Sequence, residues 1–376
     1  MLKDKILSLF NCIPLQNTII FEASPDLTDS PYYFFKYLVE HYEIQKKYKL
    51  VWFIRDNRNV SRTSLLGAPI VCVNNDSKQK DLRTRLQRLY YNYTAKAIID
   101  SNMYVYKKRP GQVRILMYHG MPIKECVEYQ QDVGDVDLLT ISGDFFRKVY
   151  LKYVPADRIR SYGLPRDEAL YDLSRGDVTE KKIVWMPTFR QHKNKDGQPV
   201  NQFPLGIPVI KTQEELALVN EALRKNHVTL MLRMHPAQDI SVLRVAPMSN
   251  IVFADNDYLH RHGMMLEDLL ADSDALITDY SSVYYDYLFT GNPIGLTFED
   301  VKVYQQTMNL IYDDIEHELP GFQMLQVPEL IRFIEDVHNG CDPCRAERDA
   351  FMKRLGMEKF PCCRLLGEFL MEKLEG

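Results

Sequence analysis

The stretch Leu276-Ile-Thr-Asp-Tyr-Ser-Ser-Val-Tyr-Tyr-Asp-Tyr-Leu288 combines an apolar run, a polar step and a helical pattern. The apolar residues predict a strand, and Gly291 and Pro293 mark where the following helix should end. A helix N-terminus presents unpaired N–H groups and the positive end of the helix dipole, so this strand–turn–helix unit suits a phosphate. An ordinary Asp or Ser N-cap is the alternative interpretation.

Four side chains of this unit are candidates for phosphate binding. Asp279 lies near the expected N-cap, and Ser281 and Ser282 place two hydroxyl donors in the first turn. Asp286 follows one turn after Ser282 on the same helix face. We therefore predict that these four residues form a phosphate-binding site.

Composition restricts the class of protein. A chain of 376 residues predicts about two domains, and 45% hydrophobic with 26% charged residues is typical of a soluble globular protein. The net charge of −4 argues against a nucleic-acid partner. No apolar run approaches the roughly 18 residues of a membrane span, and the N-terminus lacks a signal peptide's apolar core. These features predict a cytoplasmic protein.

The candidate metal ligands are weak. Seven cysteines, an odd number, fit a reducing compartment. Cys341 and Cys344 have metal-like spacing but no second well-spaced pair, and His260 with His262 lacks a third ligand nearby. No Asp-x-Asp pair or dense carboxylate cluster lies beside the motifs. We therefore expect no metal site and no required cofactor.

Strands and helices alternate along the chain. Apolar runs predict strands at 18–21, 50–54, 69–73, 97–99, 113–118, 138–141, 183–186, 228–232, 251–253 and 275–277. Helical patterns lie between many of them, and a polar linker near 165–180 separates two such series. The pattern predicts an α/β protein with two Rossmann-like domains, residues 1–175 and 176–376, facing each other across a cleft.

Polar motifs follow four of the predicted strands. These are His119, Arg190, His235 and the group 279–282. Because ligands of parallel sheets bind at the carboxyl ends of the strands, we expect these residues to form one site. A histidine has a pKa near working pH and suits a general base, while an arginine can grip phosphate oxygens bidentately.

These residues also carry a resemblance to a known family. The motifs in question are His119-Gly-Met-Pro-Ile-Lys124, Gly163-Leu-Pro-Arg166, Pro187-Thr-Phe-Arg190, Leu232-Arg-Met-His-Pro236 and Ile277-Thr-Asp-Tyr-Ser-Ser282. Together they resemble the CDP-glycerol glycerophosphotransferase family, which makes teichoic acids and related capsule polymers. The resemblance extends from about residue 18 to 370.

The resemblance implies a GT-B-like fold and a specific reaction. A polyol phosphate, glycerol phosphate or similar, would pass from CDP-glycerol or a related CDP-polyol to a hydroxyl of a glycan, lipid-linked or polyol-phosphate acceptor, with release of CMP. The N-terminal domain would bind the acceptor and the C-terminal domain the CDP donor. Two alternatives stay open: a nucleotide-sugar glycosyltransferase of the same fold, and an inactive homologue that acts as a scaffold.

The resemblance further implies roles for individual residues. His119 corresponds to the catalytic histidine on the acceptor side. His235, Ser281 and Ser282 correspond to ligands of the donor pyrophosphate, and Arg190 to a residue near the same phosphates. Two more residues within the motifs are assigned to the acceptor side or to the surroundings of the site: Lys124 and Arg166. The segment 308–314 departs from the family, because it lacks the usual Arg-Gly.

A basic and aromatic region covers residues 76–110. It holds nine basic against three acidic residues, with Tyr90, Tyr91 and Tyr93 between them. Residues 78–109 are therefore a candidate surface for binding the inner face of an anionic membrane. The alternative is a solvated helix that packs through Leu82, Leu86 and Leu89. RNA binding is a weaker third interpretation, since no stacking module is recognisable.

Overall fold

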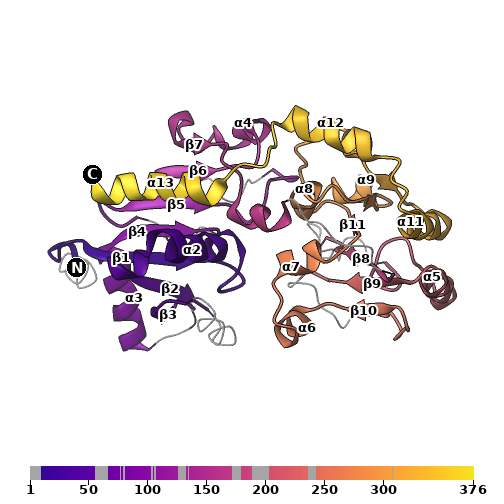
Figure 1. Ribbon diagram of the computed structural model, residues 1–376, viewed down its shortest axis with the longest axis horizontal. Helices are drawn as coiled ribbons and strands as arrows, with labels where there is room; N and C mark the ends of the chain where they lie inside the picture. The colour runs from indigo at the N-terminus through magenta and orange to yellow at the C-terminus, as the bar shows by residue number, and fades with distance from the viewer. Residues whose placement is uncertain are drawn as a thin grey trace. The chain divides into compact units, whose positions relative to one another are not determined.

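The computed structural model describes residues 10–55, 67–76, 78, 81–102, 105, 107–125, 133, 135–171, 179–188, 203–235, 243–306 and 308–376. The chain forms two compact units, each built on a parallel sheet (Figure 1). The first unit contains residues 1–121, 126–168 and 355–376, and the second contains 122–125 and 169–354.

The sheet of the first unit has the strand order β3-β2-β1-β4-β5-β6-β7, and all its pairs are parallel. Its strands are β1 (Gln16–Glu22), β2 (Lys49–Ile54), β3 (Ile70–Asn74), β4 (Ala95–Asp100), β5 (Val113–Met117), β6 (Leu138–Thr140) and β7 (Ile159–Arg160). Its helices are α2 (Asp29–Tyr42), α3 (Leu82–Thr94), α4 (Arg147–Tyr150) and α13 (Cys362–Glu375).

Helices cover both faces of this first sheet. Successive strand residues point to opposite faces of a sheet, so Ile20 and Phe21 of β1 lie on opposite faces. The Phe21 ring packs against Phe35 of α2, with ring centroids 5.0 Å apart. Ile20 belongs to a buried cluster that includes Tyr91 of α3. Both faces are therefore buried, which explains why the strands are continuous apolar runs rather than alternating ones.

The sheet of the second unit has the parallel order β10-β9-β8-β11-β12-β13. Its strands are β8 (Lys181–Trp185), β9 (Val228–Leu232), β10 (Ile251–Phe253), β11 (Ala275–Thr278), β12 (Ile294–Leu296) and β13 (Phe322–Gln323). Helices α5 (Gln213–Lys225) and α11 (Val327–Asn339) share one buried cluster with residues of β8, β9 and β11. The remaining helices are α6 (Asn256–Arg261), α7 (Leu266–Ala271), α8 (Val283–Leu288), α9 (Val301–Tyr304), α10 (Ile315–Glu318) and α12 (Arg345–Leu355).

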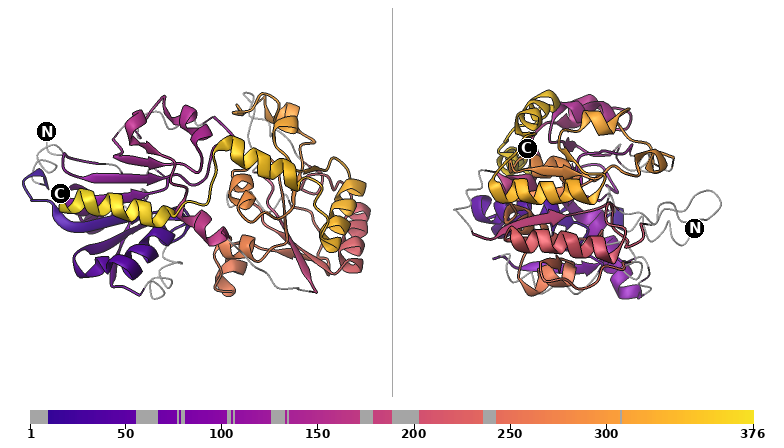
Figure 2. Two further views of the ribbon diagram at one scale, coloured as in Figure 1. Left: turned by 45° about the horizontal axis from the view of Figure 1, so that its top comes forward. Right: turned by 90° about the vertical axis from the view of Figure 1, so that its right-hand side faces the viewer.

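The compact units differ from the expected division of the chain at residue 175. The C-terminal helix α13, drawn in yellow in Figures 1 and 2, packs on α2 and β5 of the first unit. Leu366 and Leu370 are fully buried there, and the backbone N–H of Cys363 donates to Glu168 at 2.7 Å. The apolar face of α13 is visible in the sequence, but nothing in that pattern says which sheet the face covers.

Candidate functional site

The second sheet has one topological switch point, between β8 and β11. Along the chain, β8, β9 and β10 follow one another toward one edge of the sheet, and β11, β12 and β13 follow one another toward the other edge. In sheets of this kind, the loops that follow the two central strands leave in opposite directions, and ligands bind at the carboxyl ends of these strands. The loop after β8 carries Thr188, and the loop after β11 carries the group 279–282.

Asp279 joins these two loops. Its carboxylate accepts the backbone N–H of Thr188 at 2.9 and 3.1 Å and also the hydroxyl of Thr188. It further accepts the N–H of Tyr280 at 2.7 Å, and the residue is fully buried. The prediction that Asp279 lies near the N-cap is wrong, because its carboxylate faces the loop after β8. Its hydrogen bonds join the loop after β8 to the loop after β11.

The helix N-cap is Ser282, and α8 begins at Val283. Ser281 and Ser282 are half-buried and lie directly before the helix rather than within its first turn. Asp286, on α8, is buried with 6% of its surface exposed. The two serines are therefore accessible at the switch point, while Asp286 lies beneath them in the packed part of the helix.

His235 follows β9 and is exposed. The arginine two positions earlier anchors its loop: Arg233 is buried and donates to Ala254 O and to Asn256 Oδ1, both at 2.8 Å. The backbone N–H of Arg233 also bonds to Trp185 O at 2.9 Å. A buried side chain thus fixes the backbone from which the histidine extends into solvent.

The predicted donor residues gather at the same sheet edge. In the sheet, Trp185 lies level with Leu232 on one side and with Ile277 on the other. His235 and Tyr280 therefore lie three residues beyond the level positions Leu232 and Ile277, and two strand spacings amount to about 10 Å. Arg190 lies outside the described residues. The structure places His235, Ser281 and Ser282 after strands β9 and β11, at the carboxyl edge of the same sheet.

His119 follows β5 in the first unit and is exposed. Its ring stacks on Tyr118, with centroids 4.9 Å apart and an interplanar angle of 21°. Gly120 has φ of 139°, a conformation that side chains disfavour, so a glycine is required immediately after the histidine. This turn sends the chain away from the strand and leaves the imidazole at the surface.

Arg166 holds the backbone of His119. Its Nη1 donates to His119 O at 3.0 Å and to Asp29 Oδ1 at 3.1 Å, and the residue is buried. Asp29 adopts φ of 61° and accepts the N–H of Ser30 at 2.7 Å. Arg166 therefore supports the predicted catalytic residue and does not extend from the surface. Sequence reasoning missed Asp29, whose only local signal is an acidic residue directly before Ser30 and Pro31 at the start of α2.

Lys124 belongs to the second unit, although only four residues lie between it and His119. It forms an isolated antiparallel bridge with Leu310, and its ammonium lies 5.4 Å from the centre of the Tyr304 ring. The side chain is half-buried. These contacts assign Lys124 a structural position beside Tyr304.

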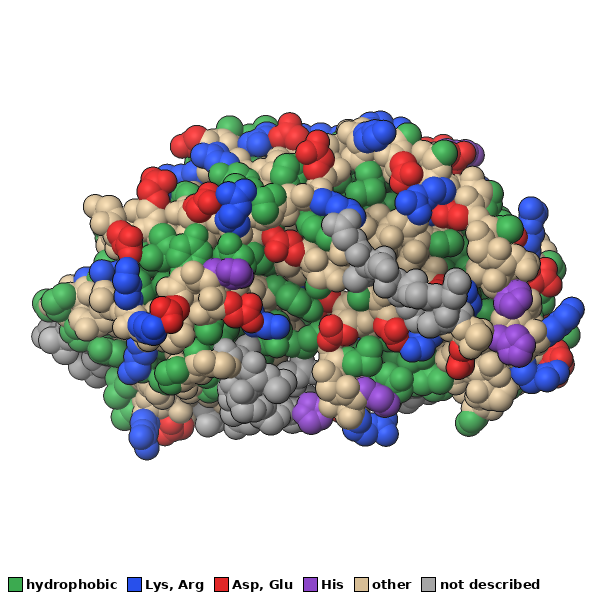
Figure 3. Space-filling model, viewed as in Figure 1, with side chains coloured by type: hydrophobic (Ala, Val, Ile, Leu, Met, Phe, Trp, Pro, Cys, Tyr) green, Lys and Arg blue, Asp and Glu red, His purple; other side chains and the backbone are tan. Residues whose placement is uncertain are grey.

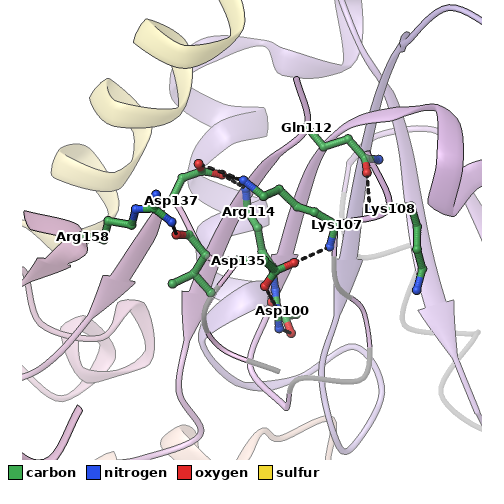
Figure 4. A network of polar contacts seen from close by, with 9 residues as sticks. Asp100, Lys107, Lys108, Gln112, Arg114, Asp135, Asp137 and Arg158 are labelled. Atoms are coloured by element: carbon green, nitrogen blue, oxygen red, sulfur yellow. Dashed lines mark hydrogen bonds and ion pairs between the residues drawn. The ribbon is translucent and has the colours of Figure 1, made fainter. Parts of the chain in front are cut away.

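A buried ion-pair network supports β5, the strand that leads to His119 (Figure 4). Arg114 is fully buried and pairs with Asp100 of β4 at 2.9 Å and with Asp135. Its backbone N–H donates to Asp137 Oδ2 at 2.7 Å, and Lys107 also pairs with that carboxylate. Burial opposes the charge of Arg114, but the two carboxylates outweigh it and raise its pKa. The network ties β4, β5 and the preceding loops together.

A second acidic group lies at the switch point of the first sheet, between β1 and β4. Glu22 ends β1 beside Asp100 and is 1% exposed. Arg55 donates to Glu22 Oε1 at 2.7 Å, and its N–H donates to Asp26 at 2.8 Å. Burial raises the pKa of Glu22 to about 8; Arg55 opposes this rise, and Asp100, Asp26 and Asp29 add to it.

A metal site and a cavity in the second unit are weaker candidates for a functional site. Within the described ranges, His, Cys, Asp and Glu side chains form no group of three or more that could hold a metal ion. A cavity of about 420 Å³ in the second unit is lined mainly by 316–321 and by α12. Because Gly321 directly precedes β13, this cavity lies toward the amino ends of the strands. It is therefore separate from the carboxyl ends of β8 and β11 at the switch point.

Comparison with known proteins identifies the family. A family model described as CDP-glycerol:poly(glycerophosphate) glycerophosphotransferase matches residues 7–356. The chain belongs to this family. The predicted CDP-glycerol-dependent glycerophosphotransferase is therefore confirmed at the level of the family, and the protein is an enzyme.

Three teichoic acid enzymes are similar to this chain at low sequence identity. A teichoic acid poly(glycerol phosphate) polymerase of Bacillus spizizenii is 24% identical over 364 residues, which cover 86% of this chain and 83% of that protein. A teichoic acid glycerol-phosphate transferase of Staphylococcus aureus is 23% identical and covers 83% and 82%. A teichoic acid glycerol-phosphate primase of Bacillus subtilis is 23% identical and covers 68% of each chain.

Solved structures confirm the GT-B-like fold. A histidine-to-asparagine variant of the wall teichoic acid polymerase TagF, soaked with CDPG, matches with a TM-score of 0.73 at 19% identity. The match covers 99% of this chain and 94% of that one. A UDP complex of Staphylococcus aureus MnaA matches with a TM-score of 0.51 at 10% identity, covering 96% and 97%.

The Asp279–Thr188 contact should control donor binding. Asp279→Asn replaces one of two acceptor oxygens by a donor that faces N–H groups, and Thr188→Val removes the hydroxyl. Each change should weaken CDP-glycerol binding by about 1–3 kcal/mol, measured by calorimetry, because the loops after β8 and β11 separate. Thr188→Ser keeps the hydroxyl and is the matched control. Equal affinity in all three variants would contradict the assigned role.

The raised pKa of Glu22 predicts a pH-dependent stability. The folded protein binds the proton of the Glu22 carboxyl more tightly than the unfolded chain does. The contribution of Glu22 to the free energy of unfolding is therefore complete below the ordinary carboxyl pKa of 4.5 and is lost as pH rises through about 8. Glu22→Gln should remove a decline of about 1.4 kcal/mol per pH unit across this window. Chemical denaturation at pH 5, 7 and 9 measures the difference. Glu40→Gln on the exposed side of α2 is the control; parallel curves for wild type and Glu22→Gln would refute the prediction.

Proposed function

We propose that the protein transfers glycerol phosphate, or a related polyol phosphate, from a CDP-activated donor to a hydroxyl of a glycan, lipid-linked or polyol-phosphate acceptor in teichoic acid synthesis. CMP is the second product. Family membership supports the reaction type. The observation that carries the proposal for this chain is the gathering of His235, Ser281 and Ser282 at the switch point of the second sheet.

The second unit binds the donor. Phosphoryl transfer depends mainly on positioning and on stabilising the charge of the phosphate oxygens. The hydroxyls of Ser281 and Ser282, which follow β11, donate to these oxygens. The imidazole of His235, which follows β9, contacts them from the other side of β8. Arg190 adds a positive charge after β8, and Asp286 supports the serines from within α8.

The first unit supplies the base. A ring nitrogen of His119 takes the proton of the acceptor hydroxyl, and the acceptor oxygen attacks the phosphorus that bears the glycerol. A new P–O bond forms there, the bridging P–O bond to the cytidylate breaks, and its electron pair leaves with CMP. Arg166 keeps the backbone of His119 in place. The reaction uses no metal or cofactor, an expectation that retained turnover in EDTA would support.

Replacement of His119 and replacement of His235 should have different effects on donor binding and on turnover. His119→Ala should cut turnover by roughly 10²–10⁴-fold with donor affinity intact, because a base acts on the acceptor. His235→Ala, Ser281→Ala and Ser282→Ala should also weaken donor binding, by roughly 1.5–3 kcal/mol for each lost hydrogen bond to a charged group. Calorimetry with CDP-glycerol and mass spectrometry of the products measure both.

His338→Ala, an exposed change on α11, serves as the control for loss of an imidazole. The same mass spectra distinguish the products: a phosphodiester with CMP supports the proposal, and a glycosidic bond with a nucleoside diphosphate identifies a glycosyltransferase. Normal turnover by His119→Ala would show that the base lies elsewhere. Donor binding by the wild type without turnover on any acceptor would identify a scaffold protein.

We further propose that α3 associates with an anionic membrane surface. Leu82, Leu86 and Tyr90 follow one another at four-residue intervals and are 68%, 40% and 36% exposed. Arg83 and Arg85 on the same helix are also exposed. Figure 3 shows basic and hydrophobic side chains together at the surface over α3. An interfacial helix combines these features, whereas a solvated helix packs its leucines inward.

The membrane-binding surface that we propose is limited to α3 and does not extend over all of residues 78–109. Lys107 pairs with Asp137 at 2.9 Å, and Arg109 donates to Ile13 O at 2.7 Å, so both side chains are engaged within the first unit. Lys80 lies outside the described residues. Among the helices in the described part of the chain, none combines the length and the apolar character that crossing a bilayer requires.

The α3 surface predicts salt-sensitive co-sedimentation with vesicles of phosphatidylglycerol and phosphatidylcholine. Arg83→Glu combined with Arg85→Glu should abolish it, since each basic residue contributes about 1 kcal/mol near an anionic surface. Leu82→Ser should weaken it without altering salt sensitivity. Arg224→Glu with Lys225→Glu on α5 is the control for charge. A wild-type protein that stays in the supernatant at low salt would exclude this surface.

A further inference from the structure

Lys124 is fixed within the second unit by its backbone. The N–H of Glu125 donates to Asn309 O at 2.9 Å, and Lys124 itself forms an antiparallel bridge with Leu310. Both segments of this pairing belong to the second unit, which contains residues 122–125. The place of Lys124 is therefore defined by the second unit alone.

The side chain of Lys124 ends over a stack of aromatic rings. Its ammonium lies 5.4 Å from the centre of the Tyr304 ring, close enough for the ring face to attract a cation. The Tyr304 ring stacks on Tyr280, with centroids 4.1 Å apart and an interplanar angle of 16°. Both tyrosines are buried, and the Tyr280 hydroxyl donates to Asp300 Oδ1 at 3.0 Å. The ammonium therefore lies on a fixed aromatic surface.

This aromatic surface belongs to the loop that carries the donor serines. Tyr280 directly precedes Ser281 in the loop after β11. The segment of Lys124 also contacts the helix that follows the serines, because the Tyr285 hydroxyl on α8 donates to Pro122 O at 3.4 Å. Lys124 is therefore linked to the loop after β11 through its side chain and to α8 through its backbone.

Lys124 extends the row of donor groups along the carboxyl edge of the second sheet. His235 follows β9, and Ser281 and Ser282 follow β11. Tyr304 lies on α9, the first helix after β12, and β12 neighbours β11 on the side away from β8. Because the ammonium of Lys124 lies over Tyr304, it adds a polar group beside the serines at the next strand.

Lys124 supplies a charge that the neighbouring donor groups lack. Ser281, Ser282 and a neutral His235 can hydrogen-bond to phosphate oxygens, but none of these three side chains is permanently charged. A diphosphate carries negative charge on both phosphates, and an ammonium offers a point charge with three N–H donors on a flexible stem. Since Lys124 is half-buried, water screens this charge less than at an exposed site. An ammonium at this place is therefore suited to a diphosphate.

We propose that Lys124 binds the diphosphate of the CDP donor and that Tyr304 positions its ammonium. This assignment differs from the acceptor-side role that the sequence motif implied for Lys124. It rests on the proposed function, in which the second unit binds the donor through His235, Ser281 and Ser282. It adds a specific requirement: the charge at residue 124 matters for cytidine compounds that carry a diphosphate and not for cytidine itself.

Calorimetry with CDP-glycerol and CDP, together with NMR titration of cytidine, tests the contact. Lys124→Met keeps an apolar stem and removes the charge. The Kd values for CDP-glycerol and CDP should therefore rise about ten- to hundredfold, while the Kd for cytidine should change less than about twofold. Lys124→Arg keeps the charge and should lose less than about threefold. Lys302→Met is the matched control, because Lys302 is an exposed lysine on the same helix as Tyr304, and its Kd values should equal those of the wild type.

Two variants of Tyr304 test the positioning role. Tyr304→Phe keeps the aromatic face and should bind CDP-glycerol as the wild type does. Tyr304→Leu removes the face and should raise the Kd about three- to tenfold. The same Tyr304→Leu change should add nothing in a Lys124→Met background, because the ammonium that the ring positions is already absent. An additive loss in the double variant would overturn the positioning role of Tyr304.

The outcomes separate this assignment from the proposed function. Unchanged affinity for CDP and CDP-glycerol in Lys124→Met would overturn the assignment, as would an equal loss of affinity for cytidine. A lower kcat with unchanged Kd would place Lys124 with the acceptor and would also overturn it. A wild type that binds CDP-glycerol but transfers nothing would instead refute the proposed function, and the Kd comparison would still decide whether Lys124 binds the diphosphate.

Discussion

The carboxylate of Asp279 is the interaction that joins the loops after the two central strands of the second sheet. A topological switch point separates the loops after β8 and β11, because the chain leaves these strands in opposite directions. A buried carboxylate is costly unless it is hydrogen-bonded, and here three donors from Thr188 and Tyr280 satisfy it. The same bonds that compensate its burial hold Ser281 and Ser282 beside the loop after β8. Stability and site geometry therefore share one interaction.

The two exposed histidines are each supported by a buried arginine. Arg166 donates to the carbonyl of His119, and Arg233 fixes the loop that carries His235. An arginine suits this purpose because its planar fork donates to several backbone and side-chain oxygens at fixed angles. Arg114 extends the same principle to the strand before His119 (Figure 4). The two imidazoles are thus accessible, while buried arginines hold the backbone beneath them.

Local patterns in the sequence predicted much of the fold. The strands 228–232 and 251–253 agree with β9 and β10 to the residue, since both are short apolar runs between clear polar breaks. A capping box of Thr212 and Glu215, which is a local sequence pattern, marks the start of α5. The strand-end rule also placed His235 and the serines at one sheet edge. Each of these features depends on residues within a few positions of one another, so the sequence by itself determined them.

Only the tertiary structure decided which partners these elements choose. Thr188 and Asp279 are 91 residues apart, and a capping role for Asp279 was equally consistent with the local pattern. Leu82 and Leu86 could have packed inward, but α3 turns them to solvent, and α13 could have covered either sheet. Periodicity records which face of an element is apolar. The surface that covers that face depends on the packing of the whole unit, which no local pattern contains.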